Sequence, residues 1–180
     1  MIRPARPDDV PSILALIREL ATYEREPDAV VATQADLASA LFGERPALFG
    51  LIAEDGNAED GNAEGGNAIA GFALWFLNFS TWLGRHGIYL EDLYVRPEFR
   101  GHGHGRELLI ELARIADERG YGRLEWSVLD WNESAHRFYA SLGAVPMQEW
   151  TTWRLAGAAL PGLANGLTSK QDDDGQTPHA

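Results

Sequence analysis

The 180-residue sequence contains no cysteine. Disulfide bonds, thiolate nucleophiles and zinc sites with cysteine ligands are therefore excluded. Basic residues are also scarce, because 15 lysine and arginine residues face 27 aspartate and glutamate residues and leave a net charge of −12. Such a chain lacks the basic surface that nucleic acid requires, whereas it attracts cationic ligands. The composition predicts no nucleic-acid partner.

Long apolar runs are absent as well. No segment approaches the roughly 18–20 apolar residues of a membrane span, and no signal peptide precedes the first charged residues. We therefore expect a cytoplasmic protein without a membrane partner. The length suits one domain with a real core, which we expect at residues 1–160. The composition beyond it predicts a disordered acidic tail at residues 161–180.

Apolar spacing predicts an alternation of helices and strands. Four helices are expected, beginning near Asp8 or Asp9 and at Thr33, Gly105 and Asn132, with Thr33 and Asp36 forming a capping box. Seven strands are expected at residues 2–4, 47–54, 69–79, 88–95, 123–129, 144–147 and 150–155. The order predicts a mixed α/β sheet with antiparallel hairpins first and a crossover later.

Residues 55–68 repeat a five-residue unit almost three times, as DGNAEDGNAEGGNA. Alanine is the only apolar residue in this segment, so the segment cannot build a core of its own. We interpret it as a flexible hairpin insertion between two strands.

One stretch of the chain stands out for chemistry. An apolar strand at residues 88–95 is followed by Arg100-Gly101-His102-Gly103-His104-Gly105 and then by an amphipathic helix. Alternate glycines leave backbone N–H groups uncovered and permit positive φ. Such groups at a helix N-terminus bind anions, so we expect the phosphate of a cofactor here. The alternative is a turn that merely requires glycine.

Several polar side chains near this stretch are candidates for catalysis or binding. His102 and His104 lie two residues apart, but no third metal ligand is evident, so we expect exposed side chains and no metal. Glu91 and Asp92 interrupt an apolar strand, with one expected on each face. Because isolated buried charge is unfavourable, they either act on a proton or cation or are structural carboxylates with partners. Tyr139 is either a proton donor or a core aromatic residue.

The pattern Arg100-x-x-Gly103-x-Gly105, placed between a strand and an amphipathic helix, resembles the coenzyme A loop of the GNAT acetyltransferase superfamily. Three further motifs resemble those of diamine (spermidine/spermine) and thialysine N-acetyltransferases. They are Tyr89-Leu90-Glu91-Asp92, Leu129-Asp130-Trp131-Asn132 and Phe138-Tyr139. The likeness covers about residues 2–155 apart from the insertion. It implies a mostly antiparallel central sheet of six to seven strands with splayed fourth and fifth strands, and about four helices.

The resemblance also implies acetyl-CoA as co-substrate and a homodimer. In such an enzyme Tyr139 is the general acid, and Glu91 is a base that acts through water. Substrate contacts are implied for Tyr23, Glu24, Glu91 and Asp92. Cofactor contacts are implied for Leu93, Tyr94, Val95, Arg100, Gly101, His102, Gly103, His104, Gly105, Arg106, Asn132 and Ala135.

One departure bears on the substrate. Diamine acetyltransferases carry paired acidic residues before a tryptophan of the terminal strand, where this chain has Trp150-Thr151-Thr152-Trp153. This favours a smaller amine. We predict an acetyl-CoA-dependent N-acetyltransferase acting by direct attack on a primary amine of a small cationic substrate, either a diamine or polyamine or a thialysine-like amine. Amino-acid, aminoglycoside-like or protein amino groups are alternative acceptors, and a non-catalytic CoA-binding sensor is the alternative of another class.

Overall fold

The computed structural model describes residues 1–56 and 68–166. The chain forms two units, Met1–Leu129 and Asp130–Ala180, and each is described by itself. Most of the expected hairpin insertion, residues 57–67, and most of the expected tail, residues 167–180, lie outside the described residues.

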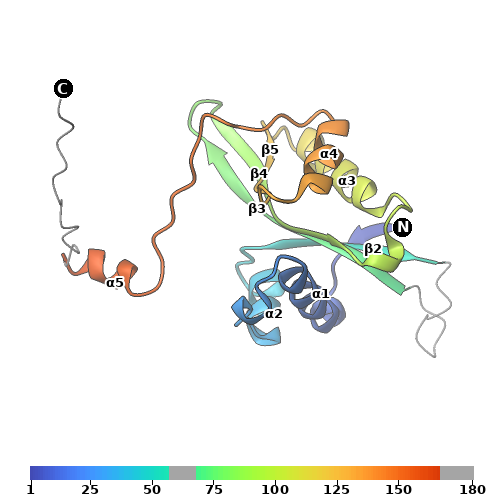
Figure 1. Ribbon diagram of the computed structural model, residues 1–180, viewed down its shortest axis with the longest axis horizontal. Coiled ribbons are helices and arrows are strands. Elements are labelled where there is room, and N and C mark those ends of the chain that lie inside the picture. The colour runs from blue at the N-terminus through green and yellow to red at the C-terminus, as the bar shows by residue number, and fades with distance from the viewer. Residues whose placement is uncertain (57–67, 167–180) are drawn as a thin grey trace, which may run out of the picture. The chain divides into compact units, whose positions relative to one another are not determined.

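The first unit is built on one sheet of five strands that follow one another in chain order (Figure 1). Strands β1 (Ile2–Pro4), β2 (Phe49–Asp55), β3 (Ala68–Ser80) and β4 (Arg85–Val95) pair antiparallel. Strand β5 (Leu124–Trp126) pairs parallel with β4. The prediction of a mixed sheet with hairpins first and a crossover later is confirmed.

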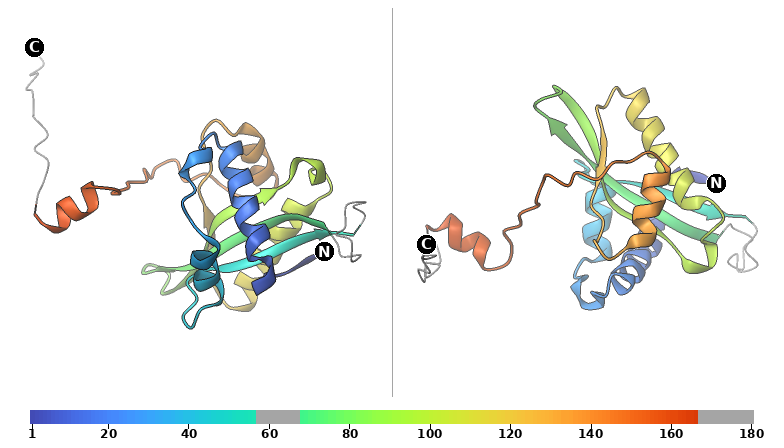
Figure 2. Two further views of the ribbon diagram at one scale, coloured as in Figure 1. Left: turned by 90° about the horizontal axis from the view of Figure 1, so that it is seen from below. Right: turned by 45° about the horizontal axis from the view of Figure 1, so that its top comes forward.

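Helices cover both faces of this sheet (Figures 1 and 2). Helices α1 (Val10–Tyr23) and α2 (Gln34–Phe42) lie on one face, and α3 (His104–Glu118) lies on the other. The predicted capping box at the start of α2 is confirmed, because Asp36 accepts from the Thr33 N–H at 2.9 Å and Thr33 Oγ1 accepts from the Asp36 N–H at 3.2 Å. Short 3-10 helices occupy Pro7–Asp9, Pro27–Ala29 and Pro97–Phe99.

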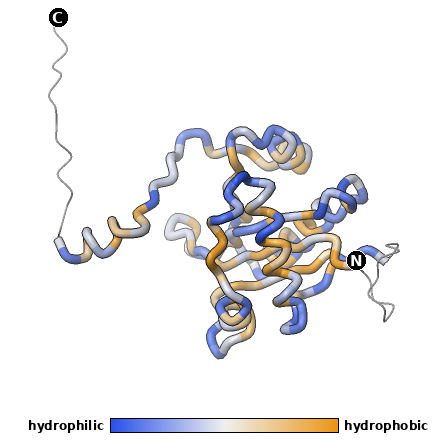
Figure 3. The backbone as a smooth tube through the Cα atoms, turned by 60° about the horizontal axis from the view of Figure 1, so that its bottom comes forward, coloured by the Kyte–Doolittle hydropathy of each residue, from blue (hydrophilic) through white to orange (hydrophobic). Residues whose placement is uncertain are grey.

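The main core lies between α1, α2 and one face of the sheet. Its buried residues are Val10, Ile13, Leu14, Leu16, Leu37, Leu41, Ile52, Phe72, Leu74 and Tyr94. Apolar residues colour long parts of the strands orange in Figure 3. Because each buried Leu, Ile or Phe side chain contributes about 1.5–3 kcal/mol, this packing makes the sheet a firm platform for the residues on its strands.

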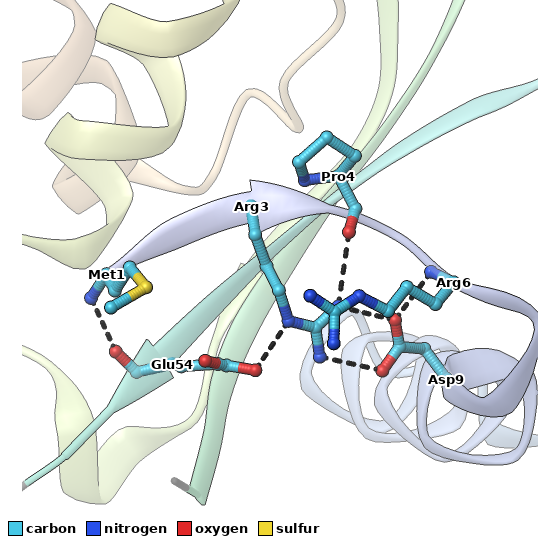
Figure 4. Close-up of polar contacts among 6 residues, drawn as sticks. All are labelled: Met1, Arg3, Pro4, Arg6, Asp9 and Glu54. Atoms are coloured by element: carbon cyan, nitrogen blue, oxygen red, sulfur yellow. Dashed lines mark hydrogen bonds and ion pairs between the residues drawn. The ribbon is translucent and has the colours of Figure 1, made fainter.

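Arg3 joins β1 to the end of β2 and to the start of α1 (Figure 4). Its guanidinium donates to Asp9 at 2.7 and 2.9 Å and to Glu54 at 2.5 Å. Burial alone raises the pKa of Asp9, but hydrogen bonds from Arg3 and from the Arg6 N–H outweigh burial and hold that pKa below its usual value. Met1 exchanges two backbone hydrogen bonds with Glu54, at 2.7 and 2.8 Å. The far end of β2 is therefore fixed in place.

The second unit contains α4 (Glu133–Ser141) and α5 (Ala159–Ala164), and its described residues 130–166 include no strand. The predicted strands at residues 144–147 and 150–155 are therefore wrong, and the described sheet has five strands instead of six or seven. A strand obtains its hydrogen bonds from a neighbouring strand, and none pairs with these segments in the described chain. Val145, Met147, Trp150 and Trp153 in them are exposed.

Helix α5 overlaps the start of the tail that the composition predicted to be disordered. The compositional argument concerns the ability to build a core and does not exclude a helix of six residues, although its proline and glycine are poor helix formers. None of the helices in the described ranges is long and apolar enough to cross a membrane.

Candidate active site

The chain passes from β4 to α3 through a loop that requires glycine. Gly101 has φ of 83° and Gly103 has φ of 92°, in the left-handed region. A Cβ atom at either position would meet no atom within 4 Å, so the requirement comes from the backbone conformation and not from a lack of space. The prediction of positive φ in this loop is confirmed at both residues, while Gly105 lies inside α3, which begins at His104.

The loop places backbone amide groups at the N-terminus of α3. The N–H of Glu107 donates to the carbonyl of Gly103 at 3.0 Å, which makes it the first bond of the helix. The amides of His104, Gly105 and Arg106 precede this bond and have no intrahelical acceptor. The partial positive charge of the helix N-terminus lies at the same place. The arrangement is that of an anion site.

Arg100 supports the loop from the side of α1. Its Nε donates to the carbonyl of Val95 at 2.9 Å, and its guanidinium lies over the rings of Tyr23 and Tyr94, at 5.0 and 5.6 Å from their centroids. These are cation–π contacts. The structure thus brings Tyr23, which was predicted to contact substrate, together with Arg100 and Tyr94, which were predicted to contact the cofactor.

A second arginine in this region was not singled out in the sequence. Arg96 binds both carboxylate oxygens of Glu19, at 2.9 to 3.2 Å, and donates to the carbonyl of Ile69. This fork fixes the end of β4 to α1 and to the start of β3. Glu19 and Arg96 are 77 residues apart, so no local sequence pattern predicts this ion pair.

Strand β4 bulges at Glu91. On β3, Trp75 lies opposite Leu90 and Leu74 lies opposite Asp92, so Glu91 is the extra residue. The expectation of one carboxylate on each face of the sheet assumed regular alternation, which the bulge interrupts. Bulges re-aim side chains and are frequent beside active sites.

Asp92 lies opposite Leu74 and therefore on the face of the sheet that packs against α1 and α2. Burial raises the pKa of Asp92 to about 6, and the negative charges of Glu91 and Glu24 add to the shift. Burial also raises the pKa of Glu24, at the end of α1. Of the three carboxylates predicted to contact substrate, Glu24 and Glu91 thus both lie close enough to Asp92 to repel it, and a cation beside Asp92 would relieve that repulsion. We call the three carboxylates the acidic group.

One edge of β4 is open beyond the bulge. Strand β5 pairs with β4 at Ile88, Tyr89 and Leu90 only. Residues 91–95 of β4 therefore have no β5 partner, and apart from the Val95 carbonyl, which accepts from Arg100, this edge offers N–H and C=O groups to an extended ligand. Leu93, Tyr94 and Val95, which were predicted to contact the cofactor, lie on this stretch between the acidic group and the glycine loop.

The two loop histidines differ in their surroundings. His102 is exposed, whereas His104 is only 7% exposed, and its Nε2 lies 2.9 Å from Oδ2 of Asp55 on β2. The expectation that both side chains are exposed is wrong for His104. Asp55 precedes His104 by 49 residues and lies in the segment that we assigned to the insertion, so sequence reasoning missed the contact.

The remaining predicted site residues belong to the second unit. Asn132 Oδ1 accepts from the Ala135 N–H at 3.3 Å and from the Ser134 hydroxyl at 3.0 Å, which confirms the predicted cap of α4. Tyr139 is half-buried on the same helix, with its ring 5.3 Å from that of Phe138. The roles of Asn132, Ala135 and Tyr139 in catalysis or cofactor binding stay predictions.

Comparison with known proteins decides the family. Residues 13–144 match the acetyltransferase (GNAT) family. The chain belongs to this family. Thialysine N-epsilon-acetyltransferase of Bos taurus is 41% identical, over 91% of this GNAT chain and 96% of that protein. L-ornithine N5-acetyltransferase NATA1 of Arabidopsis thaliana is 35% identical, over 90% of this chain and 86% of that protein.

A solved structure shares the fold. An integron cassette protein from the mobile metagenome of V. cholerae has a TM-score of 0.72 and 28% identity, over 91% of this GNAT chain and 96% of that one. The resemblance to GNAT acetyltransferases, the α/β fold class and the assignment as an N-acetyltransferase are confirmed.

Replacing Asp92 by Asn should stabilise this GNAT protein at alkaline pH. Because the folded pKa is raised, the carboxyl contributes stability below its unfolded pKa of about 4 and loses it as pH rises through about 6. Asn cannot ionise, so the gain in unfolding free energy over wild type should grow by about 2–3 kcal/mol from pH 4 to pH 8. Urea unfolding at both pH values measures it.

The control is Asp117→Asn, on the exposed surface of α3, which should change stability little at either pH. If Asp92→Asn gives the same gain in unfolding free energy at pH 4 as at pH 8, the folded protein does not disfavour the ionised form of Asp92, and the inference of a raised pKa is wrong.

Proposed function

We propose that this acetyltransferase takes the acetyl group of acetyl-CoA and transfers it to a primary amine of a small cationic substrate by direct attack. The observation that carries the proposal is the order of features along β4. The acidic group at Glu91 and Asp92 is followed by the open strand edge and then by the glycine loop, within residues 91–103. A cation and an anion are thereby accommodated at opposite ends of one short extended segment.

Acetyl-CoA fits this order of features. Its pyrophosphate is a ligand for the amide groups of residues 101–106 at the start of α3. Its pantetheine arm contains amide groups that can pair with the open edge formed by Leu93, Tyr94 and Val95. Asn132 and Ala135 at the start of α4 complete the proposed cofactor contacts. The thioester then lies near the bulge at Glu91.

Gly103→Ala should weaken CoA binding. Alanine at φ of 92° is strained by about 1–2 kcal/mol, and the loop can relieve the strain only by turning its amides. We expect the Kd for CoA to rise by about 10-fold, measured by calorimetry. Gly120→Ala is the matched control, because Gly120 also has positive φ and open space but lies at the other end of α3. It should cost similar stability and leave the Kd unchanged; equal effects of the two variants would contradict the anion loop.

The acceptor is inferred from charge. An alkylammonium group with pKa near about 10 arrives protonated at neutral pH, and the carboxylates of Glu24, Glu91 and Asp92 attract it. The names of two relatives specify amines at the end of a short amino-acid side chain, N-epsilon of thialysine and N5 of L-ornithine. At residues 150–153 the chain lacks the paired acidic residues that diamine acetyltransferases carry before a tryptophan of the terminal strand. A thialysine-like amine is therefore the proposed substrate class, and diamines come second.

The reaction needs an uncharged amine. Glu91 accepts the ammonium proton through a water molecule, and the free amine attacks the acetyl carbonyl. The N–H of Leu93 on the open edge donates to the developing oxyanion. The carbon–sulfur bond then breaks, Tyr139 gives its proton to the CoA thiolate, and the second proton of the acetylated nitrogen passes to the Tyr139 phenolate, which restores the neutral amide and the acid. Without cysteine the chain lacks the commonest acyl-accepting nucleophile, which favours direct transfer.

A panel of amines tests the function. Thiol release from acetyl-CoA should be fastest with thialysine, lysine and ornithine, slower with spermidine, and absent with a peptide or an aminoglycoside. CoA binding without thiol release for any amine would favour the non-catalytic sensor. Tyr139→Phe should lower kcat by about 10²-fold with little change in KM, because a general acid acts in the transition state. Phe138→Leu is the control, since it alters the neighbouring ring but no proton donor.

We also propose that two chains associate through the second unit. Val145, Met147, Trp150 and Trp153 are 66 to 91% exposed, and apolar side chains gathered within nine residues mark an interaction surface. A second copy would supply the neighbouring strand that this segment lacks. Light scattering should give twice the 19.8 kDa of one chain. Trp153→Ser should shift the mass toward one chain, whereas Trp82→Ser, at another exposed tryptophan, should not; a monomeric wild type contradicts the proposal.

A further inference from the structure

The loop histidines and Asp55 form a cluster with the composition of a metal site. Asp55, His102 and His104 each offer one ligand atom, and the three atoms lie within 4.8 Å of one another. Nε2 of His104 is 2.9 Å and Nδ1 of His102 is 3.7 Å from the same oxygen, Oδ2 of Asp55. For a tetrahedral zinc ion with bonds of about 2.0–2.1 Å, ligand atoms lie about 3.4 Å apart, so only small movements are needed.

The burial of the three groups also suits a metal. Asp55 and His104 are buried, with 7% exposure each, whereas His102 is exposed. Nε2 of His104 faces the carboxylate of Asp55, which accepts, so without an ion the ring proton lies on Nε2. Nδ1 of His104 has no hydrogen-bond partner among the described residues, so when Nε2 and the carboxylate both bind a cation the ring proton can lie on Nδ1 without displacing another contact. The exposed side chain of His102 lets solvent reach one of the three ligands.

The cluster rests on well-fixed elements. Asp55 ends β2, next to Glu54, which Arg3 and Met1 hold (Figure 4). His104 is the first residue of α3, and its ring meets that of Phe99 edge to face at 6.5 Å. The fold therefore holds the two buried ligands near one another without an ion, and small shifts of these side chains and of the exposed His102 complete the site.

We propose that Asp55, His102 and His104 bind a divalent transition metal, with Zn²⁺ as the ion best suited to two imidazoles and one carboxylate. The absence of an evident third ligand was the reason to expect no metal from the sequence, and Asp55 supplies that ligand. The ion would join β2 to the start of α3. The proposal does not rest on the transfer reaction, because none of these side chains has a part in the proposed chemistry.

The test is calorimetry with Zn²⁺ on the full chain without an affinity tag, in the absence of acetyl-CoA and amine. The wild type should bind one ion and melt at a higher temperature when it is bound. His102→Ala and Asp55→Asn should each weaken binding by at least about 10-fold, since removing even a group that supports a ligand costs 10–100-fold. Mg²⁺, which prefers oxygen ligands, should not compete.

Two histidines outside the cluster provide controls. His136→Ala and His179→Ala should leave the Kd for Zn²⁺ within about twofold of wild type. Absence of Zn²⁺ binding by the wild type, or equal affinity in His102→Ala, overturns the proposal. Loss of affinity in His179→Ala alone would also overturn it, because the ion would then lie near the acidic C-terminal residues. Since His102 is exposed, its removal should not unfold the chain, and circular dichroism of the variant confirms this.

Discussion

Strand β4 is held by a neighbour along its whole length on one edge and along less than half of its length on the other. β3 pairs with it from Arg85 to Val95, whereas β5 leaves it after Leu90. At the end of this pairing Gly71 lets the strands approach closely, since a Cβ there would lie 2.4 Å from the carbonyl oxygen of Tyr94. The backbone of residues 91–95 is therefore rigid on one side and unpaired by β5 on the other, which is the condition for binding an extended ligand without ordering a loop.

The acidic group works against the stability of the fold. Asp92 sits on the face that packs against α1 and α2, and its carboxyl is disfavoured there as an anion. The neighbouring core of buried aliphatic and aromatic residues supplies the opposing free energy. In contrast, the buried carboxyl of Asp9 is matched by Arg3 and by a backbone N–H. Asp92 has no such match among the described residues, and a buried carboxyl of this kind beside two others is typical of functional sites.

Features that depend on neighbours in the sequence could be predicted. The cap at Thr33 and Asp36, the cap at Asn132 and the positive φ of the glycines all follow from residues within three positions. Features that depend on distant residues could not be predicted. The bulge at Glu91 shows only in the register against β3, and the contact of His104 with Asp55 spans 49 residues.

The terminal segments illustrate the same limit in another form. Residues 144–147 and 150–155 contain the valine, threonine and tryptophan residues that strands favour, and that pattern reports only a local preference. Whether a strand forms depends on a neighbour that can exchange hydrogen bonds, and the pattern does not say whether that neighbour is in the same chain. The exposed tryptophans of this segment are consistent with a neighbour from a second chain.

In the loop from Arg100 to Arg106, the backbone amides and the histidine side chains have different roles. Its backbone amides point where an anion can bind, because Gly101 and Gly103 take left-handed conformations that other residues reach only with strain. Its imidazole side chains instead meet Asp55 on β2. The glycines therefore permit the turn of the backbone, and the histidines connect the loop to the sheet through Asp55. Because the two functions use different atoms of consecutive residues, a change in one need not disturb the other, and substitutions at the glycines and at the histidines should have separable effects.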